Sequence, residues 1–136
     1  MSLRPPLQVP ATIREFNQWC AQQITAWKEI FYTSVITPSQ ITADQDDYSP
    51  TGFSTCAVMR LSSDAVRAVT GLSGGKDGRL VKVYNVGDYT ITLNDEDSSS
   101  VAANRFTCPG SSNFTIQEAG YAELWYDDTS SRWRVH

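Results

Sequence analysis

A chain of 136 residues is long enough for one domain, or for a small domain with an arm, and a chain of this size buries roughly 68% of its unfolded surface on folding. Hydrophobic residues make up 40% of the chain and charged residues 19%, a composition that excludes wholesale disorder. The net charge of −4 argues against nucleic acid as a partner. The one histidine, His136, excludes most His-based catalysis and most zinc sites, so we expect no enzymatic activity, no metal and no cofactor.

The cysteines and the distribution of apolar residues indicate the cellular compartment in which the protein folds. Cys20, Cys56 and Cys108 lack the even number and short spacings of a disulfide framework or a zinc cluster, and we expect buried or half-buried free thiols. No stretch has the pattern of a signal peptide or the length of a membrane span. These features predict a soluble protein of a reducing cytoplasm, with no membrane partner.

The composition and the hydrophobic pattern of the chain change near residue 42, which suggests a segment 1–42 and a domain 43–136. Residues 1–10 hold three prolines and predict an extended arm, which can lie along a partner at low entropic cost. Thr12 and Glu15 form a capping-box pattern, and neither proline nor glycine occurs from Ile13 to Tyr32. One amphipathic α-helix is therefore expected to follow the arm.

The apolar residues of this helix follow a heptad pattern that only Gln23 interrupts. Two interpretations remain open: the helix packs on its own β domain, or it meets symmetry mates or another protein. Aromatic residues are common at interfaces, and the helix is rich in them. The candidate residues of a capsid or oligomer interface are Ile13, Phe16, Trp19, Cys20, Trp27, Ile30 and Phe31.

Short alternating segments after Pro38 predict β-strands. They fall at residues 56–61, 79–84, 89–93, 114–116, 121–126 and 132–135. Asn85–Asp88 has the composition of a hairpin connection, with Gly87 expected at positive φ. The sequence thus predicts a mainly β fold: a small β-sandwich or jelly-roll-like domain, preceded by the extended arm and one α-helix.

No local motif matches a known catalytic, phosphate-binding or calcium-binding pattern in full. The stretch 71–77 lacks the spacing of a phosphate-binding loop, and the acidic stretches 44–47 and 95–97 lack the glycine and terminal glutamate of a calcium-binding EF-hand. A carboxylate pair for glycoside hydrolysis could come from the same acids, but spacing does not establish one. Trp125, Tyr126 and Trp133 are either core residues or an aromatic platform for sugars, and an exposed ring among them would favour the platform.

An ordered set of motifs lies between residues 60 and 136. It comprises RLSSD (60–64), TGLSGGKDGR (70–79), YNVG (84–87), ITL (91–93), SSVAANRF (99–106), LWYD (124–127) and SRWR (131–134). This series resembles the small β domain of tailed-bacteriophage virion proteins, including capsid decoration (cement) proteins and pieces of tail fibres. The resemblance covers the last 75 to 95 residues.

The resemblance implies a β-sandwich that commonly trimerises on a phage particle, without catalysis. The expected function is a non-enzymatic virion structural protein, in the first place a capsid decoration protein that forms a homotrimer and stabilises the head lattice. The alternative is a tail-fibre or baseplate component for attachment or host recognition. The partners would be the major capsid protein or other virion proteins, and the location the virion, assembled in the bacterial host cytoplasm.

Overall fold

The computed structural model describes residues 12–30 and 33–136, and for residues 24–30 the backbone alone. The chain forms two compact units, residues 1–33 and residues 34–136. The division therefore falls at Thr33/Ser34 and not at residue 42. The reason is that Ser34–Ile36 pairs with Cys56–Met59 and so belongs to the β unit.

The first unit contains the expected helix, α1 (Ile13–Ile30). Its start follows the capping pattern, because the amide of Glu15 donates to Oγ1 of Thr12 at 3.1 Å. The amide of Phe16 donates to the carbonyl of Thr12 at 2.9 Å, which closes the first helical turn. The arm, residues 1–10, lies outside the described residues.

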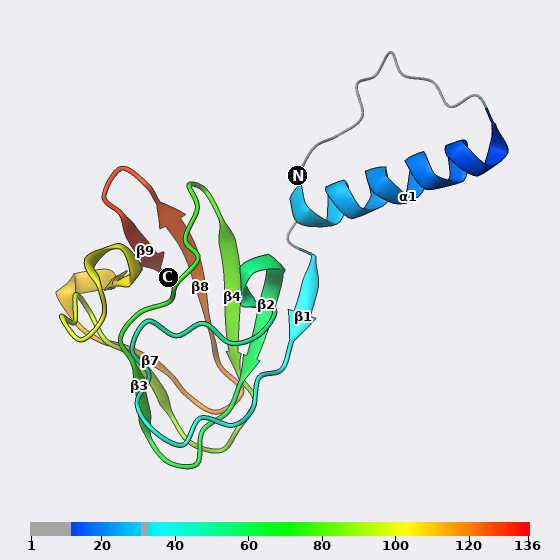
Figure 1. Ribbon diagram of the computed structural model, residues 1–136. Coiled ribbons are helices and arrows are strands. Elements are labelled where there is room, and N and C mark those ends of the chain that lie inside the picture. The colour runs from blue at the N-terminus through cyan, green and yellow to red at the C-terminus, as the bar shows by residue number, and fades with distance from the viewer. Residues whose placement is uncertain (1–11, 31–32) are drawn as a thin grey trace. The chain divides into compact units, whose positions relative to one another are not determined.

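The second unit is mainly β, as expected, and contains two sheets (Figure 1). The six-stranded sheet has the order β1 (Ser34–Ile36), β2 (Cys56–Leu61), β4 (Leu80–Asn85), β8 (Tyr121–Asp127), β9 (Arg132–Val135) and β6 (Phe106–Thr107). The three-stranded sheet has the order β3 (Arg67–Val69), β5 (Ile91–Leu93) and β7 (Phe114–Ile116). Short 3₁₀ turns occupy Phe53–Thr55, Ala102–Asn104 and Pro109–Ser111.

The strands of both sheets come from successive coils of the chain. Partners in β1–β2, β2–β4 and β3–β5 run parallel and lie 22 to 24 residues apart, as Ser34 opposite Cys56 and Arg67 opposite Ile91 illustrate. We name residues 34–51 the first coil, 56–72 the second coil and 80–94 the third coil. This solenoid-like stacking differs from the antiparallel pairing of a jelly roll.

The two ends of the coil stack are built differently. Beyond the third coil, β8 pairs antiparallel with β4, and β7 pairs antiparallel with β5. Beyond the first coil, no described residue of the β unit adds a strand, since β1 ends the order of its sheet. One end of the stack is thus covered, and within the β unit the other is not.

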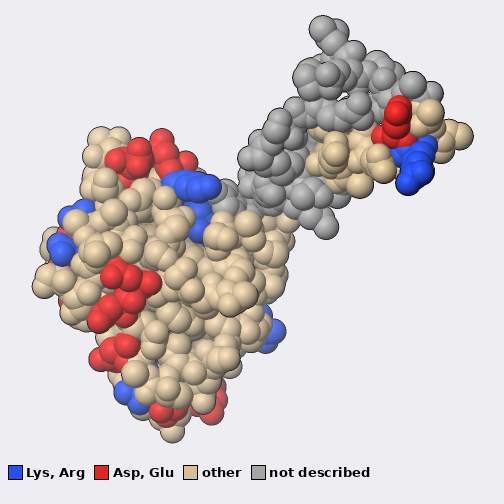
Figure 2. Space-filling model, in the orientation of Figure 1, with Lys and Arg blue, Asp and Glu red and all other residues tan. Residues whose placement is uncertain are grey.

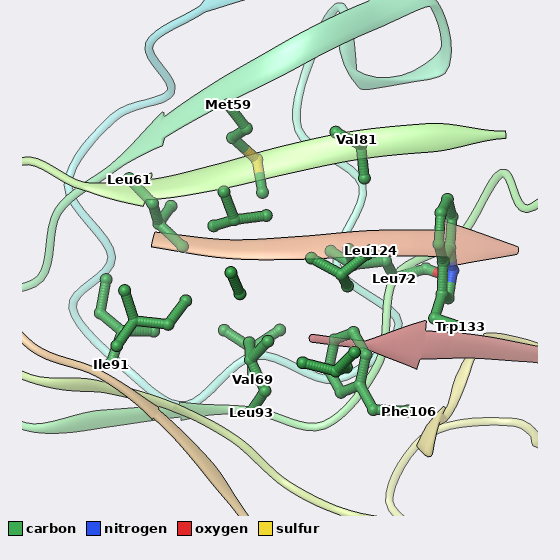
Figure 3. Close-up of a cluster of buried hydrophobic side chains, with 14 of the residues drawn as sticks. Met59, Leu61, Val69, Leu72, Val81, Ile91, Leu93, Phe106, Leu124 and Trp133 are labelled. Carbon is green, nitrogen blue, oxygen red and sulfur yellow. The ribbon is translucent and has the colours of Figure 1, made fainter. Parts of the chain in front are cut away.

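One hydrophobic core fills the space between the two sheets (Figure 3). Met59, Val83 and Ala122 follow one another across β2, β4 and β8, and each is buried. Val69 and Leu93 extend the core from the facing sheet. Since side chains alternate along a strand, this inward row sets the outward-facing residues as well.

The segment 85–89 is a corner between the two sheets and not the expected hairpin, because β4 and β5 belong to different sheets. The side chain of Asn85 is 1% exposed and donates to the carbonyls of Tyr89 and Ile116 at 2.8 and 3.0 Å. Its Oδ1 accepts from the amide of Gly87 at 3.1 Å. Gly87 does not have a positive φ. A Cβ there would lie 3.0 Å from Cβ of Ser62, so close packing calls for glycine.

Arg79 is a second buried polar residue, 2% exposed at the start of β4. Its guanidinium donates to the carbonyls of Phe53, Gly74 and Cys56. It also lies 4.4 Å from the centroid of the Phe53 ring. The side chain therefore ties two loops to the first residues of β2.

Replacing Asn85 with alanine should remove three hydrogen bonds and leave buried backbone groups without partners. We expect a loss of about 2–4 kcal/mol in the free energy of unfolding, measured by urea denaturation. The control is Asn113→Ala, because Asn113 is exposed and accepts one hydrogen bond, from the amide of Asp95. Equal stability of the two variants would contradict the role assigned to Asn85.

Candidate binding groove

A row of outward-facing side chains crosses four strands of the larger sheet. Trp125 on β8 lies opposite Leu80 on β4 and opposite Arg134 on β9, and Arg134 in turn lies opposite Thr107 on β6. Leu80 is 58% exposed and Trp125 is half-buried. The register of the strands thus places an accessible indole ring between an aliphatic side chain and a cation.

Polar contacts fix the groups beside this ring. Nε and Nη2 of Arg134 donate to Oδ2 of Asp127 at 3.1 and 3.0 Å, and Nη2 lies 3.3 Å from Oγ of Ser130. The Ser130 hydroxyl and the Arg134 guanidinium hold the pKa of Asp127 below its usual value, so this carboxyl stays ionised at neutral pH. The indole N–H of Trp125 donates to Nε2 of His136 at 3.1 Å.

A groove of about 580 Å³ lies beside Trp125 and Arg134. The lining is Thr107, Cys108, Pro109, Trp125, Asp127, Arg134, Val135 and His136. An aromatic ring, an aliphatic wall and a few fixed polar groups are the usual elements of a small-ligand site. Among the described residues that line the groove, Asp127 is the single acidic side chain, so the lining offers no pair of Asp or Glu side chains of the kind used in glycoside hydrolysis.

The aromatic residues Trp125, Tyr126 and Trp133 of the last two strands have two different roles. Trp133 is fully buried, and Tyr126 is 5% exposed and meets it edge-on with ring centroids 5.2 Å apart. Both are core residues. Trp125 is half-buried, so its ring is neither a core residue like the other two nor a fully exposed one. Sequence alternation could have separated Trp125 from Tyr126, but it does not identify Arg134 and Thr107 as neighbours.

The side chains of the acidic stretches 44–47 and 95–97 hold loops in place by accepting hydrogen bonds. Oδ1 of Asp47 accepts from the amide of Val101 and from Nδ2 of Asn104, and the Thr70 hydroxyl donates to Oδ1 of Asp46 at 2.6 Å. In the second stretch, Oδ1 of Asp95 accepts from the amide of Cys108 at 2.7 Å. Within the described residues no three His, Cys, Asp or Glu side chains are grouped as metal ligands.

The candidate interface residues of α1 are partly described. Ile13 is 81% and Phe16 52% exposed, and the Phe16 ring stacks on Trp19 at 6.2 Å between centroids. Trp19 and Cys20 are half-buried. The side chains of Trp27 and Ile30, together with Phe31, lie outside the described residues.

Comparison with models of protein families, with curated proteins and with solved structures gave no match. Across the described residues, no helix has the length and apolar character needed to cross a membrane.

The reactivity of the thiols tests whether Cys108, a lining residue of the groove, is accessible to a reagent. Burial, with Asp95 nearby, raises the pKa of Cys108 to about 12, and burial raises the pKa of Cys56. Both therefore remain protonated at pH 8, and both should react slowly with an alkylating reagent, whereas the half-buried Cys20 should react first. Mass spectrometry of the folded protein checks the order, and all three should react in denaturant. Fast labelling of Cys108 in the folded protein would contradict the burial of its thiol.

Proposed function

We propose that the protein is a non-enzymatic structural component of a tailed-bacteriophage virion. Two observations support the proposal: the ordered motifs of residues 60–136 and the mainly β unit that carries them. In this proposal α1 attaches the chain to its virion partner, and the β unit presents its outer sheet face. The expected homotrimer and the expected location on the particle belong to the same proposal.

The groove beside Trp125 favours the attachment or host-recognition role over the capsid decoration role. A decoration protein needs contacts with the capsid lattice, whereas an attachment component needs a site for a ligand on the cell surface. Sugar rings present apolar C–H faces that pack on an indole, and their hydroxyl groups pair with fixed charged groups such as Arg134 and Asp127. The partly exposed indole in a groove with this ion pair is the observation that carries the choice.

The role of the groove is tested with Trp125→Ala. Loss of the ring should weaken binding of the protein to host cells or to their purified surface polysaccharide by at least about tenfold, because stacking on the indole is lost. The matched control is Tyr89→Ala, which removes an aromatic ring that is 48% exposed and lies outside the groove lining. Binding curves of the two variants decide the question. Unchanged binding by Trp125→Ala at an unchanged melting temperature would exclude the groove.

The role of α1 is tested with Phe16→Ser. Because Phe16 is 52% exposed, the change should leave the melting temperature within about 2 °C, while incorporation into particles should fall at least about tenfold if the ring is an interface anchor. Gln18→Ser, at another exposed helix position, is the control. Normal incorporation of Phe16→Ser would remove this residue from the attachment surface.

Cryo-electron microscopy of particles separates the two roles: density on the tail supports attachment, and density on the head supports decoration.

A further inference from the structure

The first coil, residues 34–51, offers an edge and a groove that the β unit leaves uncovered. Ile41, Gln45 and Tyr48 each form a parallel bridge to the second coil. β1 ends the order of the larger sheet, whereas the far end of the stack is covered by β7 and β8. Solenoid proteins need a cap at each end of the stack, and an uncovered end is a docking surface for another segment.

A groove of about 520 Å³ lies on this coil. Tyr48 is half-buried in its lining, and its backbone is held by the amide of Tyr48 donating to the carbonyl of Gly71 at 2.9 Å. Pro38 and Pro50 are further lining residues, together with the hydroxyl-bearing Thr42 and Thr51. The groove therefore combines an aromatic ring and prolines with side chains that donate hydrogen bonds.

This combination suits a proline-rich segment. Such segments adopt an extended polyproline conformation, pack their rings against aromatic side chains and offer backbone carbonyls as acceptors. They offer few N–H groups, so they do not extend a sheet but match a lining of hydroxyl donors. Residues 1–10 of this chain, with Pro5, Pro6 and Pro10, have this composition.

The charges of the two segments are complementary. The first coil contains Asp44, Asp46 and Asp47 and no lysine, arginine or histidine. Residues 1–11 contain Arg4 and no aspartate or glutamate. Figure 2 shows the acidic side chains of the β unit gathered in several patches, which a cationic segment would approach favourably.

We propose that the groove on the first coil binds residues 3–10 of a second copy of this chain. Along the chain, the arm is separated from β1 by the 18 residues of α1, about 27 Å of helix. A spacer of this length gives the arm a span sufficient to reach a neighbouring copy. Exchange of arms would link the subunits of an oligomer and cap the uncovered end of each coil stack.

The test uses a deletion of residues 1–11, which leaves every described residue in place, and a fluorescent peptide of residues 1–12. The full chain should sediment as an oligomer at 50–100 µM, roughly the range of weak exchange contacts, and the deleted chain as a monomer. The peptide should bind the deleted chain, and Arg4→Glu or the triple change of Pro5, Pro6 and Pro10 to Ala in the peptide should weaken binding at least about tenfold. Tyr48→Ala in the deleted chain should weaken it similarly, with Tyr89→Ala as the control.

If Tyr48→Ala lowers the melting temperature, the altered peptides still test the proposal, because they are bound to the deleted chain without a change in its β unit. Absence of binding to the deleted chain would overturn the proposal, and so would equal binding of the altered peptides. A monomeric full chain that excludes the peptide, beside a deleted chain that binds it, would show that the arm occupies its own groove and would overturn exchange between copies. These outcomes do not depend on which virion role the protein has.

Discussion

The interior of the β unit depends on the parallel register in which Val58 lies opposite Lys82 and Arg67 lies opposite Ile91. A slip of one residue between coils would turn Met59 and Val83 from the core to solvent, because successive side chains of a strand face opposite sides. The two sheets share one core, so a slip in the larger sheet would also uncover Val69 and Leu93 in the smaller one. Each coil therefore fixes the position of the next.

Buried polar side chains hold the corners that join the coils. Asn85 pairs with three backbone groups where the chain passes from β4 to β5. Arg79, directly before β4, donates to the carbonyls of Phe53, Gly74 and Cys56. Tyr126 adds a contact of a different kind, because its ring packs so closely on Gly75 that a Cβ there would lie 2.2 Å away. Since an unpaired buried polar group is costly, these contacts allow few alternative paths for the loops.

The difference between the two ends of the stack gives the unit its two grooves. At the covered end, the antiparallel pairing of β8 with β9 turns Tyr126 and Trp133 inward and leaves Trp125 and Arg134 on the outer face. At the other end, the first coil presents Tyr48 and the nearby prolines beside an acidic loop. The groove beside Trp125 thus follows from the strand register, whereas the groove on the first coil is lined by residues outside the strands.

The sequence by itself determined the helix start at Thr12 and the strands 56–61, 114–116 and 132–135, because capping and two-residue alternation are local signals. It left Trp125 and Tyr126 undivided between core and surface, and the structure buries Tyr126 and leaves Trp125 partly exposed. The tertiary structure alone decided that 34–36, 67–69 and 106–107 are strands, since these segments lack the apolar–polar–apolar alternation of 114–116 and are defined only by their pairing with distant residues. It likewise decided that Gly87 serves close packing, that β4 and β5 lie in different sheets, and that Trp125 meets Arg134. Pairing between residues 22 to 24 apart has no local signature, because it depends on which buried faces can share a core.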